Sequence, residues 1–518
     1  MMRLDLLRSL PGRTDNAVLA FLVPKDDRQR ALALRRIHEV VPLPAPVRRG
    51  KDFEGKEEET LLLYTDRGGR PQRIILAGLG EFAKRSEPSN RSINLERFRA
   101  ASAAAAKRAA QANSTAKTLV ISVPGGIGGK EKFPSSEEIL VGVFEGAALG
   151  LYRFDRYLSE KKGKTKLTTI ALHPDGFDPG NALKRARVIV SSVTFARDLA
   201  NAPANEVYPA SFAYRVKKTG RKSGFRVTVF DEKKISTLGM GGILAVSAGA
   251  REWHPPRFII LEYRGPRPVN EKPVVIVGKG VTFDSGGISL KPSANMAEMK
   301  MDMSGAAAVA GTFKAAAELR LPIHLVGVVP LTENMPGGSA TKPGDIIRIS
   351  DGQTVEVDNT DAEGRLILAD ALSYIRKRYP RGVEAVIDLA TLTGACVVAL
   401  GQYATGMLGT NRKVLDELKK AGEETYERVW ELPLYKEYDH LLKSDVADVK
   451  NAGGRWAGAI TAACFLKKFA GNMPWVHLDI AGTAILEEAA PYAPKGGSGV
   501  GVRLLVQYLQ NRVGRKNA

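Results

Sequence analysis

The sequence predicts an α/β protein of two domains, and three observations lead to this fold class. Its 518 residues exceed the size of one ordinary compact domain. Short apolar segments of strand length alternate along the chain with longer segments of helical pattern, as α/β architecture requires. The balance of 44% hydrophobic and 25% charged residues is typical of a globular chain. No stretch approaches the ~18 uninterrupted apolar residues of a membrane span, so we expect no membrane partner.

The first 180 residues have the pattern of a small α/β domain. Apolar, partly β-branched segments of strand length lie at residues 16–24, 60–64, 73–79, 117–123 and 167–172. Helical patterns occur between them at residues 97–112 and 135–158. The second of these begins with Ser135 and has Glu138 three residues later, which is the spacing of a capping box. We therefore predict an N-terminal α/β domain over residues 1–180.

A helix-like run connects this domain to the rest of the chain. Residues 181–203 read NALKRARVIVSSVTFARDLANAP, and Pro203 is expected to stop the helix. The alternation then resumes, with strands expected at residues 273–277, 324–329 and 385–389 and helices at residues 304–319 and 366–378. We predict a larger C-terminal α/β domain over residues 204–518, with a central mixed sheet flanked by helices.

The cysteine content and the N-terminal residues predict a reducing, cytoplasmic location. The only two cysteines are Cys396 and Cys464, which make neither a disulfide framework nor a zinc-ligand spacing. The first residues, MMRLDLLRSLPGRTDN, lack the apolar stretch and the small-residue cleavage site of a secretory signal.

The net charge is +20, from 76 Lys and Arg against 56 Asp and Glu. Residues 1–200 hold 35 basic and 23 acidic residues, and residues 201–518 hold 41 and 33, so the excess is concentrated toward the N-terminus. The basic segment KKGKTK at residues 161–166 is one of several clusters. A solvated surface accounts for such clusters, and a DNA-binding surface is the alternative. Any such binding would be directed at phosphates and salt-dependent, because no nucleic-acid motif is present and aromatic residues are only 7%.

Acidic residues gather in three dense segments between apolar strands. Residues 278–292 (GKGVTFDSGGISLKP) carry Lys279, Asp284 and Lys291, and residues 296–304 (MAEMKMDMS) carry Asp302. The third segment, residues 355–366 (VEVDNTDAEGRL), carries its charges two residues apart, at Asp361, Glu363 and Arg365. In an extended segment this spacing would point all three to one side.

Each of these signals is weak when taken alone. A short acidic pair is usually a solvated loop, residues 283–287 could be a tight turn, and the four methionines of residues 296–303 are more often core packing. Together, however, the carboxylates would repel one another unless a cation lay between them. Oxygen ligands with one lysine nitrogen favour Mn²⁺, Mg²⁺ or Zn²⁺. The segments follow predicted strands, which is where open α/β sheets place their sites.

Residues 359–366 (NTDAEGRL) resemble the signature octapeptide of the cytosol (leucyl) aminopeptidases, the M17 metallopeptidases. The resemblance extends through further segments, at residues 201–209, 279–291, 299–306, 330–345, 388–395 and 477–483. It covers residues 190–500 strongly and the earlier part loosely. It implies a macro-domain-like N-terminal domain, a C-terminal peptidase domain and a homohexamer.

The resemblance also implies two divalent metal ions per subunit, Mn²⁺ or Zn²⁺ with Mg²⁺ as a further candidate. One ion would be held by Asp284, Asp361 and Glu363. The other would be held by Lys279, Asp284, Asp302 and Glu363, with Lys279 acting as a neutral amine because two nearby dications disfavour its charged form.

The remaining roles implied by the resemblance concern the peptide. Lys291 would polarise the scissile carbonyl, and Arg365 would hold a bicarbonate ion that acts as general base. The substrate-binding residues would be Met299, in an apolar pocket, with Thr391, Leu392 and Gly394. The expected function is release of N-terminal amino acids, preferentially apolar ones such as leucine, from peptides with a free N-terminus by metal-activated water. The alternative is a nucleic-acid-binding architectural protein on a peptidase fold.

Overall fold

The computed structural model describes residues 2–11, 16–66, 71–84, 89–112, 115–123, 133–160 and 165–517. Of the basic segment at residues 161–166, residues 161–164 therefore lie outside the described part. The chain divides into two compact units, one formed by Met1–Ser191 with Glu488–Pro494 and the other by Ser192–Glu487 with Lys495–Ala518. No helix in the described ranges has both the length and the apolar character needed to cross a membrane.

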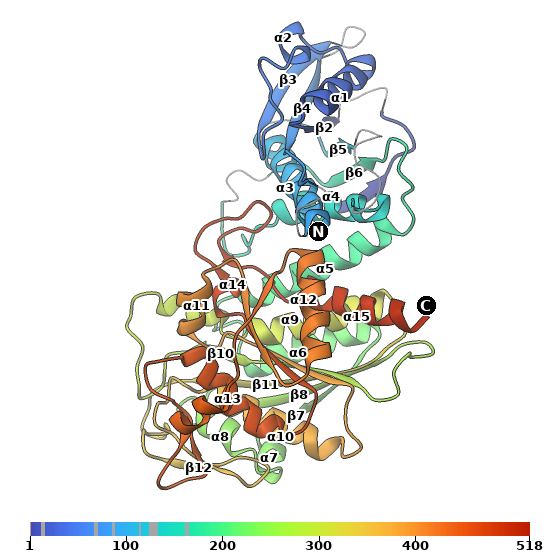
Figure 1. Ribbon diagram of the computed structural model, residues 1–518. Helices are drawn as coiled ribbons and strands as arrows, with labels where there is room; N and C mark the ends of the chain where they lie inside the picture. Colours follow the sequence, from blue (N-terminus) through green and yellow to red (C-terminus); the bar gives the residue numbers. More distant parts are fainter. Residues whose placement is uncertain are drawn as a thin grey trace. The chain divides into compact units, whose positions relative to one another are not determined.

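The first unit is built on a six-stranded sheet with the order β1-β6-β5-β2-β4-β3. Its neighbouring strands pair in parallel, except that β3 pairs with β4 in antiparallel fashion (Figure 1). Its elements are β1 (Arg3–Leu6), β2 (Ala17–Pro24), α1 (Asp27–Val40), α2 (Ala45–Arg48), β3 (Thr60–Asp66), β4 (Pro71–Gly80), α3 (Asn90–Gln111), β5 (Thr118–Ser122), α4 (Ser136–Gly150) and β6 (Thr169–His173). Helix α5 (Ala182–Asn201) contains the division between the units.

Alternation along the strands determines how the first unit packs. Leu19, Phe21 and Val23 of β2 lie in one apolar cluster with Leu34 and Ile37 of α1, because every second side chain of a strand points to the same face. Helices α3 and α4 pack against each other. The predicted strands are all present, and the short strand β1 was not predicted.

The capping box predicted at the start of α4 is confirmed. The Ser135 hydroxyl accepts a hydrogen bond from the backbone N–H of Glu138 at 3.3 Å, and the Glu138 carboxylate accepts one from the backbone N–H of Ser135 at 2.8 Å. The helix ends at Gly150, not at residue 158 as predicted, because glycine is a poor helix former at which helices commonly end.

The second unit holds a nine-stranded sheet with the order β16-β15-β18-β14-β9-β11-β8-β7, to which β10 is added beside β11. Strands β18, β14, β9 and β11 run parallel, whereas β15 and β8 are antiparallel to their inner neighbours. The predicted central mixed sheet is confirmed. Helices α6, α9, α12 and α15 cover one face and α8, α10 and α13 the other (Figure 1).

The elements of this unit, in chain order, are α6 (Pro209–Ser223), β7 (Arg226–Phe230), α7 (Glu232–Thr237), α8 (Gly241–Ser247), β8 (Arg257–Arg264), β9 (Val274–Gly278), β10 (Gly280–Asp284), the 3₁₀ helix η1 (Met296–Met301), α9 (Ser304–Glu318), β11 (His324–Asn334), β12 (Ile346–Arg348), β13 (Thr354–Glu356), α10 (Gly364–Arg378), β14 (Ala385–Ala390), α11 (Gly394–Leu400), β15 (Thr405–Gly409), α12 (Arg412–Thr425), β16 (Val429–Glu431), the 3₁₀ helix η2 (Lys436–Leu442), β17 (Val449–Lys450), α13 (Gly458–Ala470), β18 (Trp475–Asp479), α14 (Ala481–Ala484), β19 (Ile485–Leu486), β20 (Gly496–Gly497) and α15 (Val502–Asn517).

The parallel strands at the centre of the sheet all end at the same edge. Strand β9 ends at Gly278, β14 at Ala390 and β18 at Asp479. The residues at and just after these ends are brought together there, as the carboxyl edge of an open α/β sheet does in general.

Candidate metal centre

Two lysines lie among four acidic residues at this edge. Lys279 follows β9 directly, Asp284 is the last residue of β10, and Asp302 lies between η1 and α9. Asp361 and Glu363 come from the loop that precedes α10. The fold therefore brings together all five predicted metal ligands and Lys291, although 84 positions separate Lys279 from Glu363 in the sequence.

The closed half of the centre consists of Lys279, Asp302 and Glu363. The Lys279 Nζ atom lies 2.7 Å from Asp302 Oδ2 and 2.8 Å from Glu363 Oε1. It also donates hydrogen bonds to Asp302 Oδ1 at 2.9 Å and to the Thr391 carbonyl at 2.8 Å. The Lys279 and Glu363 side chains are each only 3% exposed, so this half has almost no contact with water.

The open half consists of Lys291 and Asp361. The Lys291 Nζ atom forms an ion pair with Asp361 and lies 2.9 Å from Asp284 Oδ2. Here the side chains are 22% and 33% exposed for Lys291 and Asp361. The open half is therefore the part of the centre that a dissolved molecule can reach.

Three carboxylates could hold one metal ion between them. One oxygen each from Asp284, Asp361 and Glu363 lie within 4.8 Å of one another. The prediction of an extended segment for Asp361, Glu363 and Arg365 is wrong. Glu363 has helical backbone angles and caps α10, whose second residue is Arg365. A turn followed by a helix start, and not strand alternation, brings the first two together.

The acidic surroundings raise the pKa of both lysines. Burial alone would lower the pKa of Lys279, but the carboxylates of Asp302, Glu363 and Asp284 outweigh burial and hold it above its usual range. The pKa of Lys291 is raised in the same way, chiefly by Asp284 and Glu363. Burial raises the pKa of Glu363, and the neighbouring Asp284 carboxylate adds to this effect. The protein alone thus gathers negative charge that a cation would relieve.

The donor set fits divalent metal ions. Asp302 Oδ2, Asp361 Oδ1 and Glu363 Oε1 are buried and accept no hydrogen bond of ordinary geometry from the described residues, although each faces a lysine ammonium within ion-pair distance. Buried carboxylate oxygens are costly without a cation beside them, and a divalent ion could take that place. Oxygen-rich sites with one nitrogen suit Mn²⁺, Mg²⁺ and Zn²⁺.

Two glycines allow the chain to pass close to the centre. A Cβ atom at Gly364 would lie 2.5 Å from Cε of Lys279, so only glycine leaves room for the lysine beside the start of α10. Gly286 has φ of +89°, a conformation that glycine adopts without strain. It lies in the turn between Asp284 and Lys291, the segment for which a tight turn was the alternative prediction.

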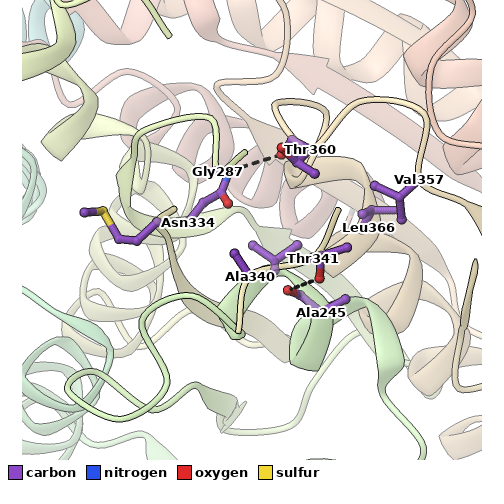
Figure 2. A pocket seen from close by; sticks show the side chains of 10 residues that line it. Ala245, Gly287, Asn334, Ala340, Thr341, Val357, Thr360 and Leu366 are labelled. Atoms are coloured by element: carbon purple, nitrogen blue, oxygen red, sulfur yellow. Dashed lines mark hydrogen bonds between the residues drawn. The ribbon is translucent and has the colours of Figure 1, made fainter. Parts of the chain in front are cut away.

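Asn334 and Thr360 form hydrogen bonds that hold the acidic segments in place. The Asn334 amide donates to Asp284 Oδ1 at 2.9 Å and to the Thr360 carbonyl at 3.1 Å. The Thr360 hydroxyl donates to the Gly286 carbonyl at 2.7 Å and accepts from the Ser289 N–H at 2.8 Å. Figure 2 shows Asn334 and Thr360 hydrogen-bonded at one side of a small pocket lined mostly by apolar side chains.

The predicted substrate-binding residues lie beside the closed half. The Thr391 hydroxyl donates to Asp302 Oδ1 at 2.7 Å. Leu392 follows in the same loop, and Gly394 begins α11. Asp479 fixes this loop, because its carboxylate accepts from the Leu392 N–H at 3.2 Å and from the Thr393 hydroxyl at 2.7 Å. Met299 lies half-buried in η1.

Arg365 is buried next to the acidic loop. Its Nη1 donates to the Asn451 carbonyl at 2.7 Å, and its Nε has no partner among the described residues. Burial lowers the pKa of Arg365 to about 10, against the opposing effect of Glu363 and Asp479. An unpartnered, buried guanidinium N–H is suited to binding a small anion.

Sequence reasoning missed the residues that orient the charged groups. Asn334 and Asp479 lie in segments that the resemblance covered, but no role was predicted for them. Asn451 lies in none of those segments. Their importance is visible only in the hydrogen bonds that they make to residues more than 25 positions away. A single sequence does not reveal such bonds.

An α/β sheet with a lysine–carboxylate centre at its carboxyl edge is the class of site that can hold divalent metal. Comparisons with known proteins give the family. The catalytic-domain model of the cytosol aminopeptidase family matches residues 194–506, and the family's N-terminal-domain model matches residues 27–161. The chain belongs to the cytosol aminopeptidase family, whose members are metal-dependent aminopeptidases with a dinuclear centre.

Relatives match along most of the chain. A probable cytosol aminopeptidase of Geobacter sp. (strain M21) is 47% identical over 89% of this chain and 90% of its own length. One of Chlorobaculum parvum is 43% identical over 96% of this chain and 97% of its own length.

Solved structures agree in fold as well as in sequence. The bottromycin maturation enzyme BotP in complex with Mn has a TM-score of 0.82 at 33% identity and covers 96% of this chain and 100% of its own. A mutant of tomato leucine aminopeptidase has a TM-score of 0.84 at 33% identity and covers 99% of this chain and 97% of its own.

Proposed function

We propose that this aminopeptidase uses two divalent metal ions per chain to release N-terminal residues, preferentially apolar ones such as leucine, from peptides. The observation that carries the proposal is the convergence of Asp284, Asp361 and Glu363, whose oxygens lie within 4.8 Å of one another. The Lys279–Asp302 pair lies next to them. Family membership supplies the reaction class, and the centre supplies the groups for it.

Each ion has its own proposed set of ligands, and the two sets share Asp284 and Glu363. Asp284, Asp361 and Glu363 would hold one ion, and Lys279, Asp284, Asp302 and Glu363 the other. When bound, the ions would supply Lewis-acid activation of water and of the scissile carbonyl. Lys279 would give up its proton to become a ligand, which the field of two dications favours. Mn²⁺ is our first candidate, because a solved relative holds Mn.

Lys291 and Arg365 have separate roles in this proposal. Lys291 belongs to the open half, so its ammonium can approach a substrate carbonyl and stabilise negative charge that develops on the oxygen. Arg365 offers an unpartnered buried N–H, which would hold a bicarbonate ion as the general base.

The free N-terminus of the peptide would be recognised by the second ion, the one assigned to Lys279, Asp284, Asp302 and Glu363. A neutral α-amino group is a good ligand for a divalent ion, and an internal peptide bond has none to offer. The loop of Thr391, Leu392 and Gly394 would position the peptide, and Met299 would contact the first side chain. One solved relative is named a leucine aminopeptidase, which supports leucine as the test substrate.

We further propose that this chain assembles into a homohexamer, as its resemblance to the family implies.

Activity after chelation tests this proposal. Metal would be removed, individual ions restored, and release of amino acids measured from a panel of amino-acid amides. We expect no activity in the chelated protein, recovery with Mn²⁺ or Zn²⁺, and faster release of leucine than of charged residues. Full activity without metal, or equal rates across the panel, would contradict it.

The nucleic-acid alternative concerns the basic residues of the first unit. Several of its arginines are already paired with carboxylates, as in Arg30–Asp27, Arg97–Glu57 and Arg185–Glu137. The net excess of residues 1–200, 35 basic against 23 acidic, therefore comes from the other basic residues. A gel shift on duplex DNA at low salt would test the accessory role.

A further inference from the structure

Asn451 is a fully buried polar residue to which neither the sequence nor the proposed function assigned a role. It directly follows β17, which pairs in parallel with β13. None of its surface is exposed. A buried amide must find partners for two donors and one carbonyl oxygen, so the location of those partners indicates what the residue holds in place.

The side chain of Asn451 uses its full hydrogen-bonding capacity on one loop. Its Oδ1 accepts from the N–H groups of Asp358 at 2.9 Å and Asn359 at 3.2 Å. Its Nδ2 donates to the carbonyls of Asn359 at 2.7 Å and Ala362 at 3.2 Å. The two N–H groups face the oxygen and the two carbonyls face the nitrogen, so the partners also fix the orientation of the amide.

The main chain of Asn451 holds the same segment at both ends. Its N–H donates to the Glu356 carbonyl at 2.9 Å, and its carbonyl accepts from Arg365 Nη1 at 2.7 Å. All six of these bonds therefore end between Glu356 and Arg365. The bonds to Asn359 and Ala362 bracket Asp361, and Glu363 comes directly after Ala362.

We propose that Asn451 is a positioning residue that presets the acidic loop for metal and aligns it with the Arg365 guanidinium. Without the amide, the loop loses four backbone hydrogen bonds, and Asp361 and Glu363 lose the frame that brings their oxygens together. Partners that orient metal ligands typically contribute 10–100-fold to metal affinity. This inference rests on the proposed role of Asp361 and Glu363 as metal ligands.

The chain offers a matched control in Asn270. It is also buried, at 2% exposure, and its amide makes three hydrogen bonds, two to the His324 backbone and one to the Lys272 carbonyl. His324 begins β11, whereas the metal centre lies at the end where that strand finishes. Replacing Asn270 thus removes comparable buried bonds at the opposite end of the sheet.

The test is Mn²⁺ titration by calorimetry of metal-free full-length protein, with thermal unfolding measured on the same samples. We expect Asn451→Ala to weaken Mn²⁺ binding about 10–100-fold, and Asn270→Ala to leave the affinity unchanged while lowering the melting temperature. At saturating Mn²⁺, the KM of Asn451→Ala for a leucine amide should match that of the wild type. Asn451→Ser, which offers one hydroxyl in place of the amide, should lie between wild type and Asn451→Ala.

The outcomes separate this inference from the function it rests on. Asp361→Ala with unchanged Mn²⁺ affinity would show that the metal assignment itself is wrong. Weakened binding in Asp361→Ala with wild-type affinity in Asn451→Ala would overturn the positioning role alone. If neither Asn451 variant folds while Asn270→Ala does, Asn451 is required for the whole fold and the inference also fails.

Discussion

The two halves of the metal centre differ in their access to water. In the closed half, Lys279, Asp302 and Glu363 are almost completely buried. In the open half, Lys291 and Asp361 keep about a quarter to a third of their side chains exposed. Both halves contain a lysine between carboxylates, so composition does not distinguish them.

The proposed function gives the two lysines different tasks, and their burial fits this division. A buried lysine that meets only carboxylates and one carbonyl can serve as a fixed ligand, and it cannot reach a substrate. A partly exposed lysine on a loop can meet the substrate but is held less firmly. Under the proposed function, this pair of similar side chains would divide metal binding and charge stabilisation between them.

The largest effect is expected at a ligand that the two proposed ions share. Glu363→Ala removes a carboxylate assigned to both ions, and Asp361→Ala removes one assigned to a single ion. Losing several kcal/mol of transition-state stabilisation corresponds to about 10³-fold in rate. We therefore expect kcat/KM for a leucine amide to fall at least ~10³-fold in Glu363→Ala and less in Asp361→Ala. Near-normal activity in either variant would contradict the ligand assignment.

Exchanging each lysine for methionine tests the division of tasks directly. Lys291→Met should lower kcat about 10²–10³-fold, the usual cost of removing one group that stabilises an oxyanion, and should keep Mn²⁺ bound. Lys279→Met should lose Mn²⁺ affinity first. The checks are steady-state kinetics and metal content after dialysis. Equal metal loss in both variants would contradict the proposal that Lys279 binds metal and Lys291 does not.

A smaller effect should follow from crowding the closed half. Gly364→Ala places a Cβ 2.5 Å from Lys279 Cε, which is too close for two carbon atoms, so the lysine must shift. We expect ~10-fold weaker Mn²⁺ binding, at the low end of what displaced support of a ligand costs. Gly338→Ala is the control, because a Cβ there meets no atom within 4 Å. Unchanged affinity in Gly364→Ala would show that the closed half tolerates movement.

The smallest effect concerns a region outside the centre. Ser135→Ala removes the cap of α4 and should cost about 1 kcal/mol of stability in urea unfolding, with kcat and KM unchanged. Ser136→Ala is the control, because it leaves the Ser135 cap in place. A change in KM in Ser135→Ala, at intact metal content, would mean that the first unit affects catalysis.

The sequence predicted the parts of this centre that depend on residue type and chain order. Strands such as β9 and β14, and the dense acidic segments between the strands, were found because apolar runs and dense charge are local signals. The position of Glu363 was explained wrongly, since a helix start rather than an extended segment carries it. Asn451 was missed because its importance lies in bonds to a loop some 90 positions earlier, and the different burial of Lys279 and Lys291 exists only after folding.

The most direct test of the two-lysine account is a crystal structure of Mn²⁺-loaded protein, with anomalous scattering used to locate the metal. The account predicts two manganese positions per chain among Asp284, Asp302, Asp361 and Glu363, with Lys279 Nζ bound to one of them and Lys291 Nζ bound to neither. A single position, or Lys291 rather than Lys279 as a ligand, would contradict it.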